Sequence, residues 1–399
     1  MNIFNKIYCR VYQWIFKIAM PLLPYRKPET LESVLDIKNI LKMNYLKSAL
    51  IVTDKGIRNL GLVDSLEFDL KDNLITPTIF DNIVPNPTVQ NIEDGVKTYT
   101  ENNCDCIIAF GGGSVMDCAK MIGARVSNPK NTVSKMKGLL KVKNKLPMLI
   151  AIPTTAGTGS ETTIAAVITD PEKKHKYVIN DFKLIPYYAV LDANLTLGLP
   201  KHITSTTGMD ALTHAIEAYI GNTTTEETRK ASLEACRLIF ENIKKVYDDG
   251  SNLRSRQYML KASYLAGVAF TRSYVGYVHA IAHSLGGKYN TPHGLANAVV
   301  LPYVLSEYKE SVYKKLSEIA IYSGVARKYD SEQNAANKLI NKIFELNEHM
   351  GIPRKFDFIE EDDIYEMSKH ASVEANPLYP VPKLMSRKEL AKIYYKIKS

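Results

Sequence analysis

The hydrophobic pattern of this chain changes near residue 200, and that change limits the possible folds more than any other feature. Between about residues 46 and 200, short β-rich runs alternate with helical patterns; the runs cover 46–53, 104–110, 147–152 and 188–191. Such alternation predicts a mostly parallel sheet with helices on its faces. Beyond residue 200 the strand signal nearly vanishes, and helical spacing dominates. We therefore expect an α/β domain followed by an all-helical domain.

The length of the chain supports this division. Its 399 residues are about twice the usual size of a domain. A seam is predicted at 192–200, where Gly198 and Pro200 interrupt helical structure. The sequence thus predicts one domain over residues 1–197, of which 1–44 form an N-terminal extension or arm, and a second over 198–399.

The N-terminal extension contains a short apolar stretch. Val11, Trp14, Ile15 and Ile18 share one helical face. The stretch is too short to span a bilayer and is interrupted by Lys17. We expect an arm that packs on its own domain or on a partner subunit, with peripheral membrane association as the alternative.

Charge and cysteine content narrow the class of protein. The net charge is +9, but the basic residues are scattered and no nucleic-acid-binding signature accompanies them. We therefore expect no nucleic-acid partner and no transmembrane segment. The five cysteines are odd in number and form no CxxC pair, which favours a reducing cytoplasm over a disulfide framework.

A glycine-rich loop follows the second predicted strand. Residues 111–114 read Gly-Gly-Gly-Ser, and a helical pattern begins at Val115. Glycines before a helix N-terminus let an anion approach backbone N–H groups, so this loop could hold a phosphate. Alone the motif is weak, because many tight turns contain glycines and the usual GxGxxG fingerprint is absent.

Two further loops strengthen the case for a dinucleotide. Asp54 ends the first predicted strand, where a carboxylate could bind a ribose 2′-hydroxyl and would favour NAD over NADP. Its alternative role is that of a surface or helix-capping residue. Thr154 and Thr155 follow the third strand. Ligands of open α/β sheets bind at the carboxyl ends of the strands, where all three loops are expected.

The helical half contains a candidate metal site. Asp210 and His214 are four residues apart within one helical pattern, and His279 and His283 repeat that spacing before His293. One carboxylate and three imidazoles suit Fe(II) or Zn(II). Four histidines compete for three positions, and each one taken alone could be an ordinary core or surface residue.

Together these segments resemble the iron-containing (group III) alcohol dehydrogenase family. The likeness covers about residues 45–355 in order. It is carried by VTDKG (52–56), VPNPT (84–88), GGGSVMDCAK (111–120), IPTTAGTGSE (152–161), GMDALTHAIEAYI (208–220) and VHAIAHSLGGKYNTPHGLANAVVLP (278–302). The resemblance implies a Rossmann-like dinucleotide-binding N-terminal domain and an all-α, metal-binding C-terminal domain.

The resemblance also implies site residues. Those matching the metal ligands are Asp210, His214, His279 and His293, and His283 matches a catalytic histidine beside substrate and nicotinamide. Those matching cofactor-binding positions are Asp54, Gly112, Gly113, Ser114, Thr154, Thr155 and Lys176.

The implied activity is hydride transfer between NAD(H) and a primary alcohol/aldehyde pair, with the substrate oxygen bound to the metal. Fe(II) is the expected metal, with Zn(II) as the alternative, and NADP(H) is disfavoured. A cytoplasmic homodimer or higher homo-oligomer is expected. The alternatives are a diol, glycerol or lactaldehyde oxidoreductase and, further away, a dehydroquinate-synthase-like lyase. Residues before about 40 and the segment 376–382 depart from familiar members, which leaves substrate preference and oligomeric contacts open.

Overall fold

The structure of the chain is a computed structural model that describes residues 1, 3–20, 25–170 and 175–399. For residues 170, 175 and 176 it describes the backbone alone. It forms two compact units, Pro24–Leu197 and a helical unit that combines Met1–Leu23 with Gly198–Ser399. The sequence assigned residues 1–44 to the N-terminal domain, whereas here residues 1–23 group with the helical unit. The domain boundary at 197/198 stays a prediction. Within the described residues, no helix has the length and apolar character needed to cross a membrane.

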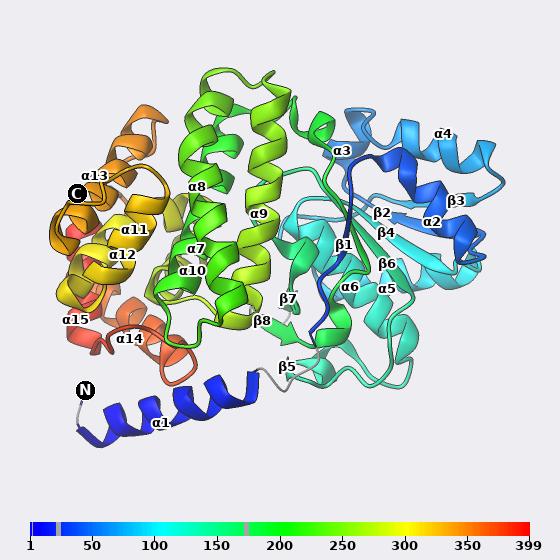
Figure 1. The fold of residues 1–399 in the computed structure, drawn as a ribbon. Coiled ribbons are helices and arrows are strands. Elements are labelled where there is room, and N and C mark those ends of the chain that lie inside the picture. Colours follow the sequence, from blue (N-terminus) through cyan, green and yellow to red (C-terminus); the bar gives the residue numbers. More distant parts are fainter. Residues whose placement is uncertain (2, 21–24, 171–174) are drawn as a thin grey trace. The chain divides into compact units, whose positions relative to one another are not determined.

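A six-stranded parallel sheet forms the centre of the unit Pro24–Leu197 (Figure 1). Its order is β1 (Glu29–Leu31), β9 (Tyr188–Val190), β6 (Met148–Pro153), β4 (Cys106–Gly111), β2 (Ser48–Val52) and β3 (Thr76–Phe80). All five pairings between neighbouring strands are parallel. The α/β prediction is thus confirmed.

Each of the four predicted runs overlaps one of these strands, whereas β1 and β3 were not predicted. β1 has only three residues, and β3 contains Pro77, which the chain tolerates because β3 lies at an edge of the sheet.

Both faces of this sheet are covered, because successive side chains of a strand point to opposite faces. Leu50 and Ile107 belong to one core cluster, which also contains residues of α5 (Val89–Glu101) and α6 (Gly113–Ser127). Ile51 and Ile108 belong to the other, with residues of α2 (Ile37–Met43) and α4 (Asp64–Asp72). Since both faces are buried, the strands read as nearly continuous apolar runs, which is why the sequence reveals them.

A smaller sheet belongs to the same unit. Its order is β5 (Gly138–Leu139), β8 (His175–Asn180) and β7 (Ala165–Asp170), with β7 and β8 antiparallel. These strands were not predicted. A short helix, α3 (Lys55–Asn59), follows β2 and has Asp54 as its N-cap.

The second unit has no strand in its described residues and is built from helices packed on one another. They are α7 (Lys201–Ile220), α8 (Glu226–Asp248), α9 (Leu253–Ser273), α10 (Tyr277–Tyr289), α11 (His293–Tyr308), α12 (Tyr313–Tyr322), α13 (Glu332–His349), α14 (Ile364–Ala375) and α15 (Arg387–Ile397). α7 packs against α8, α9 and α11, and α10 against α11 and α14. The predicted all-helical half is confirmed.

The helix α1 (Ile3–Ala19) belongs to this helical unit. The Arg10 guanidinium donates to the carbonyl oxygens of Val381 and Pro382 at 2.7 and 2.9 Å. The Gln13 side-chain amide donates to the carbonyl oxygen of Tyr379 at 2.7 Å. The predicted helical face is present, but its side chains are exposed. The helix contacts its own unit through its other side, which also carries the buried Cys9 and the half-buried Phe16, whose ring centroid lies 5.0 Å from that of Tyr274.

Candidate metal centre and dinucleotide loops

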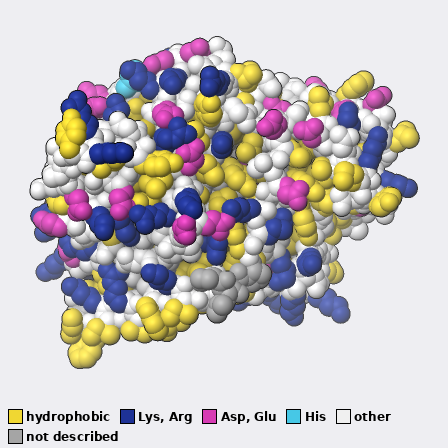
Figure 2. Space-filling view, viewed as in Figure 1, with side chains coloured by type: hydrophobic (Ala, Val, Ile, Leu, Met, Phe, Trp, Pro, Cys, Tyr) yellow, Lys and Arg dark blue, Asp and Glu magenta, His cyan; other side chains and the backbone are white. Residues whose placement is uncertain are grey.

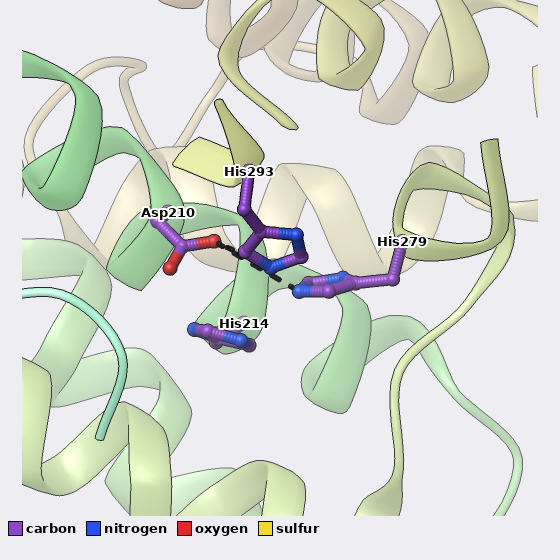
Figure 3. Close-up of side chains that lie close together, drawn as sticks. All are labelled: Asp210, His214, His279 and His293. Carbon is purple, nitrogen blue, oxygen red and sulfur yellow. Dashed lines mark ion pairs between the residues drawn. The ribbon is translucent and has the colours of Figure 1, made fainter. Parts of the chain in front are cut away.

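Four side chains from three helices converge in the helical unit (Figure 3). Asp210 and His214 lie one turn apart on α7, His279 lies in the first turn of α10, and His293 is the first residue of α11. Each offers one ligand atom, and these atoms lie within 4.8 Å of one another. The structure therefore brings together the four residues that the family resemblance implied as metal ligands, and their role as ligands stays a prediction.

Two contacts show how the carboxylate lies against the imidazoles. Asp210 Oδ1 is 3.5 Å from His293 Nε2 and 4.0 Å from His279 Nε2. The His214 ring lies between the Phe270 ring, with centroids 4.2 Å apart, and the His279 ring, at 4.6 Å. Asp210, His214 and His279 are almost fully buried, and the His293 side chain remains 42% exposed. The cluster is thus open on the side of His293.

A buried carboxylate orients His279. Glu217, on α7, accepts hydrogen bonds from the backbone N–H groups of Gly276 and Val278, both at 2.8 Å. Its Oε2 also lies 2.6 Å from His279 Nδ1, so Nδ1 carries the proton and Nε2 keeps its lone pair. His279 Nε2 is buried and has no hydrogen-bond partner among the described residues. A lone pair left free beside other donor atoms is what a divalent cation requires, so the residues present fit a metal ion.

The first turn of α11 is placed by close contacts on both sides. Asn297 lies one turn after His293, and its amide donates to Asp210 Oδ1 at 2.7 Å and lies 3.1 Å from His293 Nε2. Gly294 packs against α7 so closely that a Cβ atom there would lie 2.5 Å from the carbonyl oxygen of Thr206. The position of His293 therefore depends on a glycine as well as on its own side chain.

Burial keeps two of the imidazoles neutral, as metal ligation needs. Desolvation lowers the pKa of His279 well below its usual range, and the neighbouring imidazoles act in the same direction. Desolvation also lowers the pKa of His293 to about 4. Glu217, by contrast, is a carboxyl whose pKa burial raises to about 7.

His283 lies one turn after His279 on α10 and is not part of the quartet. Its ring stacks on that of His293 at 5.2 Å between centroids, and 41% of its side chain is exposed. Its Nδ1 lies 2.6 Å from Glu374 Oε1, and the Tyr379 hydroxyl donates to the same oxygen at 2.7 Å. Burial opposes the charged imidazole, but the nearby carboxylates, Glu374 above all, together raise the pKa of His283.

In the unit Pro24–Leu197, the glycine loop occupies the carboxyl end of β4. Helix α6 begins at Gly113, and among the described residues no side chain caps it at Gly112. The N–H groups of its first turn can therefore face an anion. The loop after β6 lies beside it, because the Thr154 N–H donates to the Gly111 carbonyl oxygen at 3.2 Å. Thr154 is buried and Thr155 is half-buried.

Other predicted cofactor residues have partners of their own. Ser114 Oγ accepts a hydrogen bond from the Asn86 N–H at 3.2 Å, which ties segment 84–88 to the glycine loop. Asp54 is the N-cap of α3, since its Oδ1 accepts from the Ile57 N–H at 2.9 Å. The capping role weighed for Asp54 is thus present, and its role toward ribose stays a prediction. Lys176 lies in β8, and its side chain falls outside the described part of the chain.

A buried charged cluster supports these loops. The Lys120 ammonium, on α6, donates to Ser160 Oγ, Thr163 Oγ1 and the Ala165 carbonyl oxygen at 2.8–2.9 Å. Burial lowers the pKa of Lys120 to about 8 and raises that of Glu161 to about 7. Glu161 Oε1 is buried without a hydrogen-bond partner in the described part of the chain.

The sequence reasoning missed the residues that position the site: Glu217, Glu374, Asn297, Lys120 and Glu161. A signal existed for two of them. Glu217 follows His214 by three residues, and Asn297 follows His293 by four, so each shares a helix face with a candidate ligand. Glu374 is 91 residues from His283, and no local spacing indicates that contact.

Comparison with known proteins identifies similar chains over nearly the whole length. Residues 31–193 match the family described as iron-containing alcohol dehydrogenase, and residues 204–398 match the C-terminal part of the Fe-containing alcohol dehydrogenase family. The 1,3-propanediol dehydrogenase of Citrobacter freundii is 40% identical over 352 residues, which cover 87% of this chain and 90% of that protein. The NAD-dependent methanol dehydrogenase of Bacillus methanolicus is 35% identical over 341 residues, covering 85% and 89%. A crystal structure of a 1,3-propanediol oxidoreductase matches with a TM-score of 0.90 and 37% identity over 94% of this chain and 99% of that one.

Proposed function

Because this chain belongs to the iron-containing alcohol dehydrogenase family, we propose that it is an oxidoreductase that transfers a hydride between NAD(H) and a primary alcohol/aldehyde pair. The observation that carries the proposal is the convergence of one carboxylate and three imidazoles within 4.8 Å in the helical unit. The name of the methanol dehydrogenase relative, which includes NAD, supports the choice of coenzyme. A diol, glycerol or lactaldehyde substrate remains the alternative.

Asp210, His214, His279 and His293 would hold the cation. When bound, a divalent cation supplies Lewis-acid polarisation of a substrate oxygen. We propose Fe(II), with Zn(II) as the alternative, because both accept this set of donors. Glu217 keeps the proton of His279 on Nδ1, so that the lone pair of Nε2 is available to bind the cation.

His283 would move the proton of the reaction. Its Nδ1 is held by Glu374, which leaves Nε2 to exchange a proton with the substrate hydroxyl or with water. Its exposure gives that proton a path to solvent. The backbone of Gly112 and Gly113 and the side chains of Ser114, Thr154 and Thr155 would bind the dinucleotide, with Asp54 at the ribose and Lys176 as a further contact.

We further propose that the enzyme works in the cytoplasm as a homodimer or higher homo-oligomer. All five cysteines are free and buried, which agrees with a reducing compartment. Mass measurement in solution would test the oligomeric state.

The proposed function can be tested by turnover. Protein loaded anaerobically with Fe(II) should change NADH absorbance at 340 nm with primary alcohols or aldehydes, and EDTA-stripped protein should lose at least about a hundredfold in kcat. Re-addition of Fe(II) or Zn(II) should restore activity and identify the better metal. Full activity in the stripped protein would contradict the proposal. An absence of net NADH turnover across the whole panel would instead favour the lyase alternative.

A further inference from the structure

Helix α1 differs from an ordinary surface helix because most of its large apolar side chains are exposed. A helix on a protein surface normally buries its apolar side and exposes its polar side. In α1 the buried side chains are Cys9 and Gln13, and Arg10 is tied down by the carbonyl oxygens of Val381 and Pro382. The side of α1 that carries Cys9, Arg10 and Gln13 thus fixes the helix to its own unit.

The opposite side of α1 is an apolar surface that nothing in the described part of the chain covers. At least half of each of these large side chains is exposed: Phe4, Ile7, Val11, Trp14, Ile15 and Ile18. Figure 2 shows hydrophobic side chains along the lower left edge, where Figure 1 draws α1. Monomeric proteins rarely expose a contiguous apolar surface of this kind, so it indicates a partner.

The charges of this region indicate the chemistry of that partner. The helix carries Lys6, Arg10 and Lys17 and no acidic residue, and the first acidic residue of the sequence is Glu29. Lys6 and Lys17 are exposed, and Lys17 lines a pocket of the helical unit together with Lys315 and Glu318. A second copy of α1 would bring no carboxylate to these cations, because the helix contains none. An anionic surface would attract them instead, and the net charge of +9 acts in the same direction.

We propose that α1 binds the protein to the surface of an anionic lipid bilayer, with the helix lying in the plane of the membrane and its apolar face among the headgroups. Exposed aromatic and aliphatic side chains, flanking lysines and a length too short to span are the features of such interfacial helices. Because Arg10 and Gln13 hold the other side of α1, the helix would carry the helical unit to the membrane. This inference does not depend on the proposed catalytic function.

Trp14 makes the proposal directly measurable, because it is the only tryptophan of the chain and lies 63% exposed on the apolar face. The full chain should cosediment with phosphatidylserine-containing vesicles, and its fluorescence should shift to the blue. It should bind pure phosphatidylcholine vesicles at least about tenfold more weakly.

Variants of α1 give the matched comparison. Ile7→Glu should weaken vesicle binding by at least about tenfold. The control Val373→Glu, at an exposed position on α14, should bind like the parent protein. Lys6→Glu combined with Lys17→Glu should lose the preference for phosphatidylserine, whereas Lys328→Glu combined with Lys369→Glu, at exposed positions elsewhere, should largely keep it.

Two results would overturn the proposal. One is a Trp14 emission unchanged by phosphatidylserine vesicles. The other is a pair of findings that would assign the apolar face to a second copy of the chain. In the absence of lipid, the blue shift of Trp14 would grow with protein concentration, and Ile7→Glu would sediment with a lower mass than the parent protein. Turnover of Ile7→Glu without lipid should equal that of the parent, which separates this test from that of the enzyme activity.

Discussion

The two histidines of α10 are one helical turn apart, yet their carboxylate partners give them different properties. Glu217 is buried with His279, where desolvation lowers the pKa of the imidazole. Glu374 holds the half-exposed His283, and there the carboxylate raises the pKa of the imidazole. A neutral ring suits a metal ligand, and a ring whose charged form is stabilised by a carboxylate suits proton transfer. One helix can therefore supply both roles because the partners differ.

Replacing Glu374 should change the pH dependence of the reaction. If His283 acts as the proposed base in alcohol oxidation, it must be neutral, so activity should rise with pH through its pKa. The Glu374 carboxylate raises this pKa, and Glu374→Gln should therefore move the rising limb of kcat/KM to lower pH. The control Glu366→Gln changes an exposed residue of α14, the helix that also carries Glu374, and should leave the profile unchanged. An unshifted profile for Glu374→Gln would show that His283 is not the titrating group.

The elements of this chain differ in how far the sequence predicts them. The central strands β2, β4 and β6 are buried on both faces, so their apolar runs are visible in the sequence. β3 escapes notice because Pro77 is unusual in a strand and acceptable only at an edge. Asp210 and His214 were found because they share a helix face, and His279 because it shares one with His283. Glu374 was not found, since its contact depends on how α10 and α14 pack. The sequence could not predict which side of α1 faces the rest of the protein, because periodicity identifies an apolar face but not what that face contacts.

Burial of a charged cluster next to the glycine loop should make stability depend on pH. Glu161 has a usual pKa near 4.5 that rises to about 7 in the folded chain, so folding favours its protonated form. Its contribution to stability is fully present below pH 4.5 and is lost as pH rises toward 7. Glu161→Gln stays neutral and should remove this loss, which gives a difference of about 1–3 kcal/mol at pH 7.

Urea unfolding at several pH values would measure this difference. The control Glu101→Gln, at an exposed position of the same unit, should lose stability with pH in parallel with the parent protein. If Glu161→Gln also ran parallel to the parent from pH 4.5 to 7, the buried carboxyl would not be the cause.

The two units of the molecule contain different parts of the proposed machinery. The glycine loop, Asp54 and the threonine loop belong to Pro24–Leu197, and the four candidate ligands belong to the helical unit. Each group is positioned by contacts within its own unit, such as the bond from Thr154 to Gly111 and the pairing of Glu217 with His279. Metal binding and coenzyme binding should therefore be separable by mutation.

His279→Ala should separate them. It removes one donor and leaves Glu217 without its imidazole, so Fe(II) affinity should fall by more than about a hundredfold. The affinity for NADH, measured by fluorescence titration, should change by less than about threefold, because its predicted contacts lie in the other unit. His370→Ala, an exposed histidine of α14, should keep both affinities. A parallel loss of NADH binding in His279→Ala would show that the two functions are not independent.

All four candidate ligands lie in one unit, and this bears on what happens to the protein when the proposed cation is scarce. The donors are positioned by their neighbours, by Glu217, Asn297 and the tight contact at Gly294, and not by anything supplied from outside. Protein that lacks the cation should then stay folded and keep its dinucleotide bound, but should be inactive. Addition of the cation alone should then restore activity as fast as the cation binds, without synthesis of new protein.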